Sequence, residues 1–292
     1  MNRSILLAFT LLFFSTSTLA WTLSADFEEG SPGDVGELPT KDAFHRTADW
    51  SAISNTKVLT GKQSGSVTAK KGQTGFGKWG GSLQFPSFPK EGDEIWFRVN
   101  VFYPTGWDFS CGGCTQGMKF MRIHTRNSSG GHEGYLDNLI KGGTTGGLLV
   151  ADSEVNGTDF KANNREGGTD LRKNLGTPVQ RNQWHTYEMY LKLSSGKGIY
   201  RIWQDGNLIF EDLKTNTLGT SGSSADFMYL YTYWNNGAPR TQTSYVDDIV
   251  ITTDIPSRKD AHGNAFIGVG ESNYIADPKS GGQFSGKAIP KN

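Results

Sequence analysis

The stretch Gln116-Gly-Met-Lys-Phe-Met-Arg-Ile-His-Thr-Arg126 has the two-residue period of a β-strand. Met121 and Ile123 fall on one face of this predicted strand. The basic side chains fall on the opposite face: Arg122, His124 and Arg126. Arginine presents a planar fork that matches a carboxylate, and histidine exchanges a proton near neutral pH. The face is therefore either a solvated basic surface or a site for an anionic ligand, and the other strands have to distinguish the two.

Several further segments alternate apolar and polar residues and are separated by glycine-rich turns. These segments are 21–30, 64–69, 81–85, 94–103, 146–153, 183–193, 198–210, 227–234 and 244–252. The hairpin in 198–210 turns at Asp205-Gly206, which tolerates the positive φ angles of a type I′ turn. Because no long amphipathic helical pattern occurs, we predict an all-β fold, a single jelly-roll sandwich of two sheets. The residues predicted for its core are Phe97, Val99, Met121, Ile123, Leu191 and Leu230.

Residues 1–20 have a basic start, an apolar run and a small-residue exit that ends at Ala20, the features of a secretory signal peptide. We expect the jelly-roll domain over 21–255 and an irregular C-terminal tail over 256–292 that packs on it. No later stretch is apolar enough to cross a membrane. The formal net charge of zero gives no support for a nucleic-acid partner. We therefore expect a secreted monomer, extracellular or periplasmic.

The two cysteines, Cys111 and Cys114, are separated by two glycines. In an exported protein this spacing favours a disulfide that pins a loop. A zinc site would need further ligands nearby, and a thioredoxin-like redox pair would need a βαβ unit. We predict the local disulfide.

The segment 227–234 places Met228 and Leu230 on one face and a row of tyrosines on the other: Tyr229, Tyr231 and Tyr233. Other predicted strands carry polar or aromatic side chains opposite their apolar faces: Trp96, Arg98, Asn100, Tyr190 and Trp203. If these strands share one sheet, its open face is a concave basic groove lined with aromatic rings. Rings offer an apolar surface to sugars and arginines bind carboxylates, so the predicted partner is an anionic polysaccharide.

Two kinds of cleavage could act on such a polymer. Glycoside hydrolysis normally needs two carboxylates across the scissile bond, and the acidic residues here are scattered: Glu133, Glu188, Asp247 and Asp248. Elimination from a uronic acid needs a group that neutralises the carboxylate, a base for the C5 proton and an acid for the leaving oxygen. Arginine, histidine and tyrosine on one sheet face favour elimination, so we predict a lyase that needs no cofactor for catalysis.

We assign the catalytic roles to Arg122, His124, Tyr229 and Tyr231. Arg122, alone or together with Asn100, is expected to neutralise the carboxylate, and His124 to act as the base or as a second neutralising group. Tyr231 is expected to donate or remove a proton, with Tyr229 as the alternative. The substrate-binding residues are then Arg98, Asn100, Arg126, Tyr190, Trp203 and Tyr233.

Four motifs resemble those of the concanavalin A-like jelly rolls of secreted polysaccharide lyases, above all the glucuronan and alginate lyases. They are 117–126, 184–188 (Trp-His-Thr-Tyr-Glu), 200–206 (Tyr-Arg-Ile-Trp-Gln-Asp-Gly) and 245–250 (Tyr-Val-Asp-Asp-Ile-Val). Arg122-Ile123-His124 is similar to the Gln-Ile-His strand of alginate lyases, with arginine in place of glutamine. The resemblance covers 21–255 and implies β-elimination from a uronic-acid polysaccharide. A non-catalytic carbohydrate-binding module or lectin is the alternative, followed by a glycoside hydrolase; the size of the domain favours an enzyme.

The same resemblance implies a structural Ca²⁺ between the first and last strands. Asp26, Glu28 and Asp248 supply the hard oxygen donors that calcium prefers. Alternatively, these carboxylates only keep the edge of the sheet from aggregating.

Overall fold

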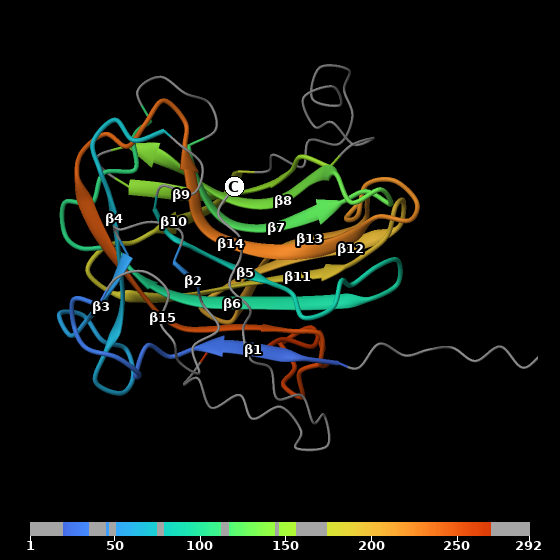
Figure 1. Cartoon of the computed structure of the whole chain (residues 1–292), viewed down its shortest axis with the longest axis horizontal. Helices are drawn as coiled ribbons and strands as arrows, with labels where there is room; N and C mark the ends of the chain where they lie inside the picture. Colours follow the sequence, from blue (N-terminus) through green and yellow to red (C-terminus); the bar gives the residue numbers. More distant parts are fainter. Residues whose placement is uncertain are drawn as a thin grey trace, which may run out of the picture.

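The computed structural model describes residues 20–34, 45–46, 51–74, 79–111, 117–143, 146–155 and 174–269. Within these ranges the chain forms β-strands and no α-helix (Figure 1). The strands are β1 (Thr22–Ala25), β2 (His45–Arg46), β3 (Ser51–Ser54), β4 (Ser64–Ala69), β5 (Gly81–Gln84), β6 (Glu94–Phe102), β7 (Met118–Arg126), β8 (His132–Gly143), β9 (Gly146–Ser153), β10 (Asn174–Val179), β11 (Trp184–Lys192), β12 (Gly198–Gln204), β13 (Asn207–Thr215), β14 (Ser224–Trp234) and β15 (Gln242–Thr252). The predicted all-β jelly-roll sandwich is confirmed.

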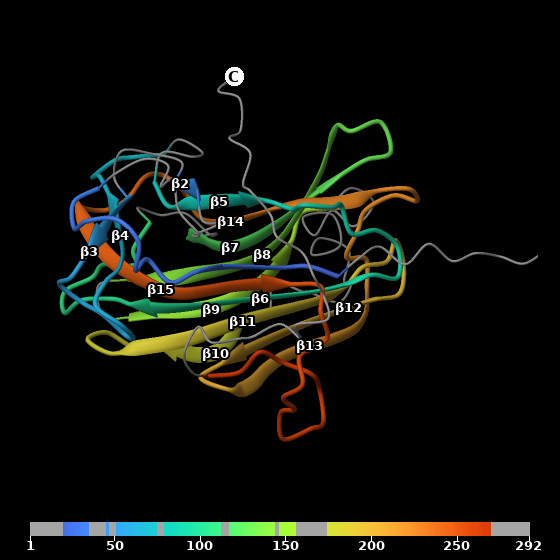
Figure 2. The ribbon, with the colours of Figure 1, turned by 60° about the horizontal axis from the view of Figure 1, so that its bottom comes forward.

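Two antiparallel sheets form the layers of the sandwich (Figure 2). In the described part of the chain, one sheet has the order β10-β9-β8-β7-β14-β5-β2, and we call it the β7 sheet. The other has the order β13-β12-β11-β6-β15-β4-β3, with β1 paired to β15, and we call it the β6 sheet. Each sheet therefore has an inner face toward the other sheet and an outer face turned away from it.

The core lies between the inner faces. All six residues predicted for it belong to one buried cluster: Phe97, Val99, Met121, Ile123, Leu191 and Leu230. Each large apolar side chain that leaves water contributes about 1.5–3 kcal/mol, so this cluster is the main force that holds the two sheets together. Alternation in β6, β7 and β11 sets their register, because a slip by one residue would turn these side chains to the outer face.

One central strand was missed from the sequence. β8 (His132–Gly143) pairs with β7 along its length, although the segment that begins it reads as a polar, glycine-containing turn. The predicted hairpin at Asp205-Gly206 is confirmed, since both residues have positive φ angles, 51° and 79°, between β12 and β13.

Residues 256–269 cover the outer face of the β6 sheet, and Figure 2 shows this red segment on the side away from the β7 sheet. Hydrogen bonds attach this segment to the sheet. Trp96 donates to the carbonyl of Ala265 and Arg98 to that of Gly268. The buried carboxylate of Glu188 accepts hydrogen bonds from the N–H groups of Ile267 and Gly268 at 2.6 and 2.9 Å. The predicted leader lies outside the described residues. No helix among the described residues is long and apolar enough to span a membrane.

Candidate active site

The outer face of the β7 sheet brings the side chains of β8, β7 and β14 together, because these strands are neighbours in the sheet. Arg122 of β7 lies opposite Asp137 of β8 and Tyr229 of β14. Two pleat repeats along β7, Arg126 lies opposite His132. The predicted basic stripe therefore has its own partners on β8, and those partners decide what each cation can do.

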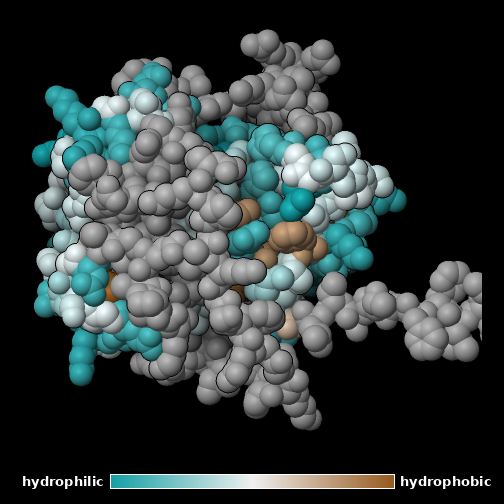
Figure 3. Space-filling view, in the orientation of Figure 1, coloured by the Kyte–Doolittle hydropathy of each residue, from teal (hydrophilic) through white to brown (hydrophobic). Residues whose placement is uncertain are grey.

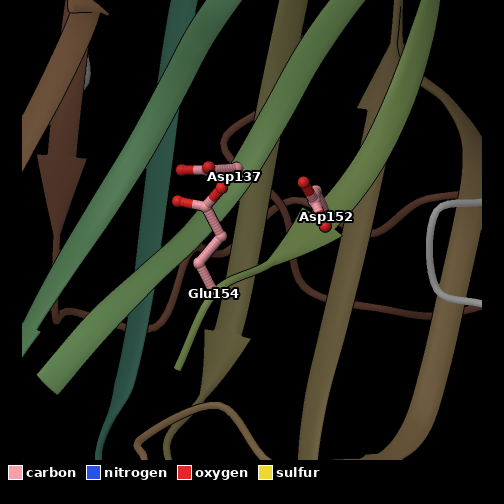
Figure 4. A group of neighbouring side chains, drawn as sticks. All are labelled: Asp137, Asp152 and Glu154. Atoms are coloured by element: carbon pink, nitrogen blue, oxygen red, sulfur yellow. The ribbon is translucent and has the colours of Figure 1, made fainter. Parts of the chain in front are cut away.

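Arg122 belongs to a buried ion cluster. Its guanidinium binds Asp137 at 2.5 and 3.1 Å and Glu154 at 3.0 Å, and only 3% of the residue is exposed. Lys119 joins the same cluster, with Nζ at 3.1 Å from Asp137 and 2.6 Å from Glu154. Figure 4 shows Glu154 reaching toward Asp137, with Asp152 on the adjacent strand. The expectation that Arg122 receives a substrate carboxylate directly is wrong, because its fork already holds two carboxylates of the protein.

Opposite charges set the protonation states in this cluster. Burial alone would raise the pKa of Asp137, but Arg122 and Lys119 lower it below its usual range. Burial would likewise lower the pKa of Arg122, yet Asp137 raises it. The carboxylate oxygens of Asp137, Asp152 and Glu154 lie within 4.8 Å of one another, close enough for a metal ion. Because Lys119 and Arg122 supply two positive charges among them, we assign the group to charge pairing and not to metal binding.

A second group, the histidine–tyrosine cluster, lies farther along the same face. His124 Nδ1 hydrogen-bonds to the carboxylate of Asp226, and His124 Nε2 lies 2.9 Å from Nδ1 of His132. The rings of His132 and Tyr135 have centroids 5.1 Å apart, and Tyr135 lies 6.3 Å from Tyr229. Burial raises the pKa of Tyr229 well above its usual range, so its hydroxyl keeps its proton and can donate it. An imidazole chain beside two phenols is a set of groups able to move protons.

Arg122 links the two groups. Its guanidinium carbon lies 3.6 Å from the centroid of the Tyr135 ring, so a cation–π contact joins the ion cluster to this tyrosine. On the rim, Arg126 extends over the ring of Phe88 at 4.9 Å and makes no ion pair with any residue that the structure describes. Arg126 is therefore the arginine of β7 that an anionic ligand can reach.

Two β-bulges in β14 change the alternation expected from its sequence. The register to β7 shifts between Ala225 and Phe227, which turns Asp226 toward His124. It shifts again between Leu230 and Tyr233, where Tyr231 has a φ of 58°. Tyr231 is consequently fully buried in the core, with its hydroxyl 2.9 Å from that of Tyr103. The expectation that Tyr231 faces the groove is wrong, because the bulge re-aims its side chain.

Four other predicted ligands belong to the β6 sheet and thus lie on a different surface: Arg98, Asn100, Tyr190 and Trp203. Arg98 donates to the carbonyls of Gly268 and Asp248, and Trp203 donates to Asp260 at 2.8 Å. Tyr190 packs with Trp96 and Trp203 in a small apolar cluster, and Asn100 is bonded to Thr186 and Asp247. They hold the sheet and segment 256–269, so their assignment to a shared groove was wrong. The assumption that all polar faces share one sheet failed.

Two further predicted residues are not fully covered by the described part of the structure. The side chain of Tyr233 and the whole of Cys114 lie outside the described residues. Cys111 is buried and disulfide-bonded. The local disulfide itself stays a prediction.

Two of the three predicted calcium ligands, Glu28 and Asp248, contact one loop, 59–63, and Asp26 accepts the N–H of Glu28 at 3.1 Å. β1 pairs with β15 as far as Ala25 opposite Ile249, and Asp26 follows directly after the last residue of this pairing. Asp248 accepts a hydrogen bond from this loop at 3.0 Å, and Glu28 accepts two at 2.8 and 2.9 Å. Burial and the charge of Asp248 raise the pKa of the adjacent Asp247 to about 7. Adjacent buried carboxylates with further oxygen donors nearby fit the ligand chemistry of Ca²⁺.

Sequence reasoning missed most residues of the histidine–tyrosine cluster: His132, Tyr135 and Asp226. The signal for two of them was the His-x-x-Tyr-x-Asp pattern at 132–137, whose tyrosine and aspartate share a strand face. It was overlooked because the glycines at 130, 131 and 134 favour a turn. For Asp226 no sequence signal exists, since it faces His124 only through a bulge.

The outer face of the β7 sheet thus combines imidazoles, phenols and an accessible arginine, the groups that acid–base chemistry on an anionic polymer requires. The chain belongs to the polysaccharide lyase family, whose model matches residues 31–250 of its 292. The protein is therefore a lyase that acts on a polysaccharide.

Solved structures show the same fold at low sequence identity. The alginate lyase Aly36B is 13% identical over 79% of this chain and 96% of its own, with a TM-score of 0.52. A marine alginate lyase from Aplysia kurodai is 13% identical over 80% and 99%, with a TM-score of 0.53. An endo-β-1,4-glucuronan lyase from the fungus Trichoderma reesei is 14% identical over 81% and 96%, with a TM-score of 0.50. No curated protein matches the sequence.

Proposed function

We propose that this lyase is secreted and cleaves a uronic-acid polysaccharide of the alginate or glucuronan class by β-elimination. The observation that carries the proposal is the histidine–tyrosine cluster beside Arg126 on the outer face of the β7 sheet. Three structurally similar proteins are named as alginate or glucuronan lyases, and one of them was solved with an alginate trisaccharide. Figure 3 shows hydrophilic side chains around a small hydrophobic patch on the visible face, a composition suited to a sugar polymer.

Elimination needs the uronate carboxylate to be neutralised before its C5 proton becomes acidic. In our proposal Arg126 binds this carboxylate, since Arg122 is committed to Asp137 and Glu154. An imidazole of the cluster takes the C5 proton, and Tyr229 or its neighbour Tyr135 protonates the leaving oxygen. The C5–H electron pair becomes the C4–C5 double bond as the C4–O bond breaks.

Hydrolysis fits the same face less well. It would require one carboxylic acid with a raised pKa to protonate the leaving group. Asp137 has a lowered pKa, and Asp226 is bonded to His124. The carboxylates of this face thus serve as partners for cations and histidine.

Ultraviolet absorbance of the products tests the proposal. Purified protein is incubated separately with alginate, glucuronan and a glycosaminoglycan, and unsaturated ends are followed with time. We expect absorbance to rise with alginate or glucuronan. New reducing ends without that absorbance would contradict elimination, and a rise with the glycosaminoglycan alone would contradict the substrate class.

A structural calcium ion is proposed at Asp26, Glu28 and Asp248. Its support is the contact of Glu28 and Asp248 with the same loop, 59–63, together with the buried neighbour Asp247. These residues belong to β1, β15 and their adjoining loops, so the ion would tie the first strand to the last and take no part in proton transfer.

A further inference from the structure

Within the histidine–tyrosine cluster, the hydrogen bonds fix the tautomers of the two histidines when both rings are neutral. Asp226 is a carboxylate and only accepts, so Nδ1 of His124 carries the hydrogen of the bond between them. Neutral His124 then has its lone pair on Nε2, and His132 Nδ1 must donate to it across 2.9 Å. The lone pair of neutral His132 consequently lies on Nε2.

Nε2 of His132 is the ring nitrogen that takes no part in the hydrogen bond to His124. His132 is exposed, whereas Asp226 is buried. Among the residues that the structure describes, none hydrogen-bonds to His132 Nε2. Arg126 is the cross-strand partner of His132, and directly opposite residues have Cβ atoms roughly 4.5–5.5 Å apart. One uronate can thus place its carboxylate on Arg126 and its C5 proton near His132.

We infer that His132 is the catalytic base and that Asp226 and His124 are positioning residues that raise its proton affinity during the reaction. This inference rests on the proposed elimination and names which imidazole performs it. His132 Nε2 takes the C5 proton, and its Nδ1 proton can shift to His124, whose imidazolium is stabilised by Asp226. The C5–H electrons form the double bond, the C4–O electrons go to the leaving oxygen, and a tyrosine hydroxyl protonates that oxygen. Solvent then carries the proton from the imidazolium to the tyrosinate.

The electrostatic surroundings keep the base ready at neutral pH. Burial of part of the ring, His124 and Arg122 lower the pKa of His132, while Glu154 and Glu133 oppose them. Two further titratable groups lie beside the two histidines: Asp226 of β14 contacts His124, and Tyr135 of β8 contacts His132. His132 is therefore neutral at pH 7 and has a lone pair to accept the C5 proton.

Matched glutamine substitutions test the assignment in the full-length enzyme. His132→Gln should lower kcat at least about 100-fold with a KM within about threefold, because general-base catalysis contributes about 10²–10⁴-fold. His262→Gln removes an exposed histidine of segment 256–269 and should leave both constants unchanged. Asp226→Asn should lower kcat about 10-fold or more and move the acid limb of the kcat/KM profile to lower pH, because the relay becomes a weaker base.

Chemical rescue separates a base from a structural residue. Imidazole added to His132→Ala should restore part of the lost rate, and it should not restore Tyr229→Phe. Two results would overturn the assignment. In the first, His132→Gln is as active as wild type. In the second, imidazole rescues His124→Ala but leaves His132→Ala inactive. If wild type yields no unsaturated product from any polyuronate, the proposed function itself fails; if it does and His132→Gln is fully active, only the role of His132 fails.

Discussion

Replacing Arg122 by methionine tests whether the ion cluster under the candidate site is structural. The substitution keeps much of the aliphatic volume but leaves Asp137, which is 0% exposed, with Lys119 as its remaining ion-pair partner among the described residues. Removing one partner of a buried pair costs about 3–5 kcal/mol, since an uncompensated charge stays in the interior. We therefore expect the free energy of unfolding to fall by that amount.

The assay is urea unfolding followed by tryptophan fluorescence. Arg201→Met is the matched control, because Arg201 pairs with Glu211 at 2.6 Å with side-chain exposures of 15% and 34%. Such a pair should cost only about 0–1 kcal/mol. The double variant Arg122→Met/Asp137→Leu should recover much of the loss, because it removes both charges. An Arg122→Met protein as stable as Arg201→Met would refute the reasoning.

Three further predictions concern residues outside this cluster. Tyr231→Phe should keep nearly the wild-type kcat/KM and lose about 1 kcal/mol of stability, because its hydroxyl bonds to Tyr103 in the core; an inactive but stably folded variant would restore its catalytic role. Burial raises the pKa of Glu188 from 4.5 to about 7, so the stability it contributes is complete below pH 4.5 and is lost as the pH rises through 7. Urea unfolding of wild type and Glu188→Gln over this window should show that decline only in wild type, and equal slopes would contradict it. Calcium should raise the melting temperature of wild type after chelator treatment but not that of Asp248→Asn, and an equal rise in both would exclude the proposed site.

The sequence predicts the fold where alternation is regular. Phe97, Met121 and Leu191 occupy the core because strict period-two strands have only one face that can be buried. β8 escaped prediction because its glycines have a stronger local preference for turns than its later residues have for a strand. Pairing with β7 and β9 overrides that preference in the folded chain.

The site was predictable only in part, and for different physical reasons. His124, Arg126 and Tyr229 follow from alternation alone, and they do share the outer face of the β7 sheet. Which strands share a sheet depends on long-range pairing, so Arg98 and Trp203 were placed on the wrong surface. A β-bulge adds one residue to one strand. The two bulges of β14 turn Asp226 outward and Tyr231 inward, and the sequence alone does not indicate where they occur.

Product analysis in oxygen-labelled water tests the central claim most directly. Elimination breaks the C4–O bond without adding water, whereas hydrolysis places one solvent oxygen in the products. After digestion of alginate or glucuronan, mass spectrometry should find unsaturated oligosaccharides free of the label, and His132→Gln should yield hardly any of them. Products that carry one labelled oxygen at each cleaved bond would contradict elimination and, with it, the proton-transfer role of His132.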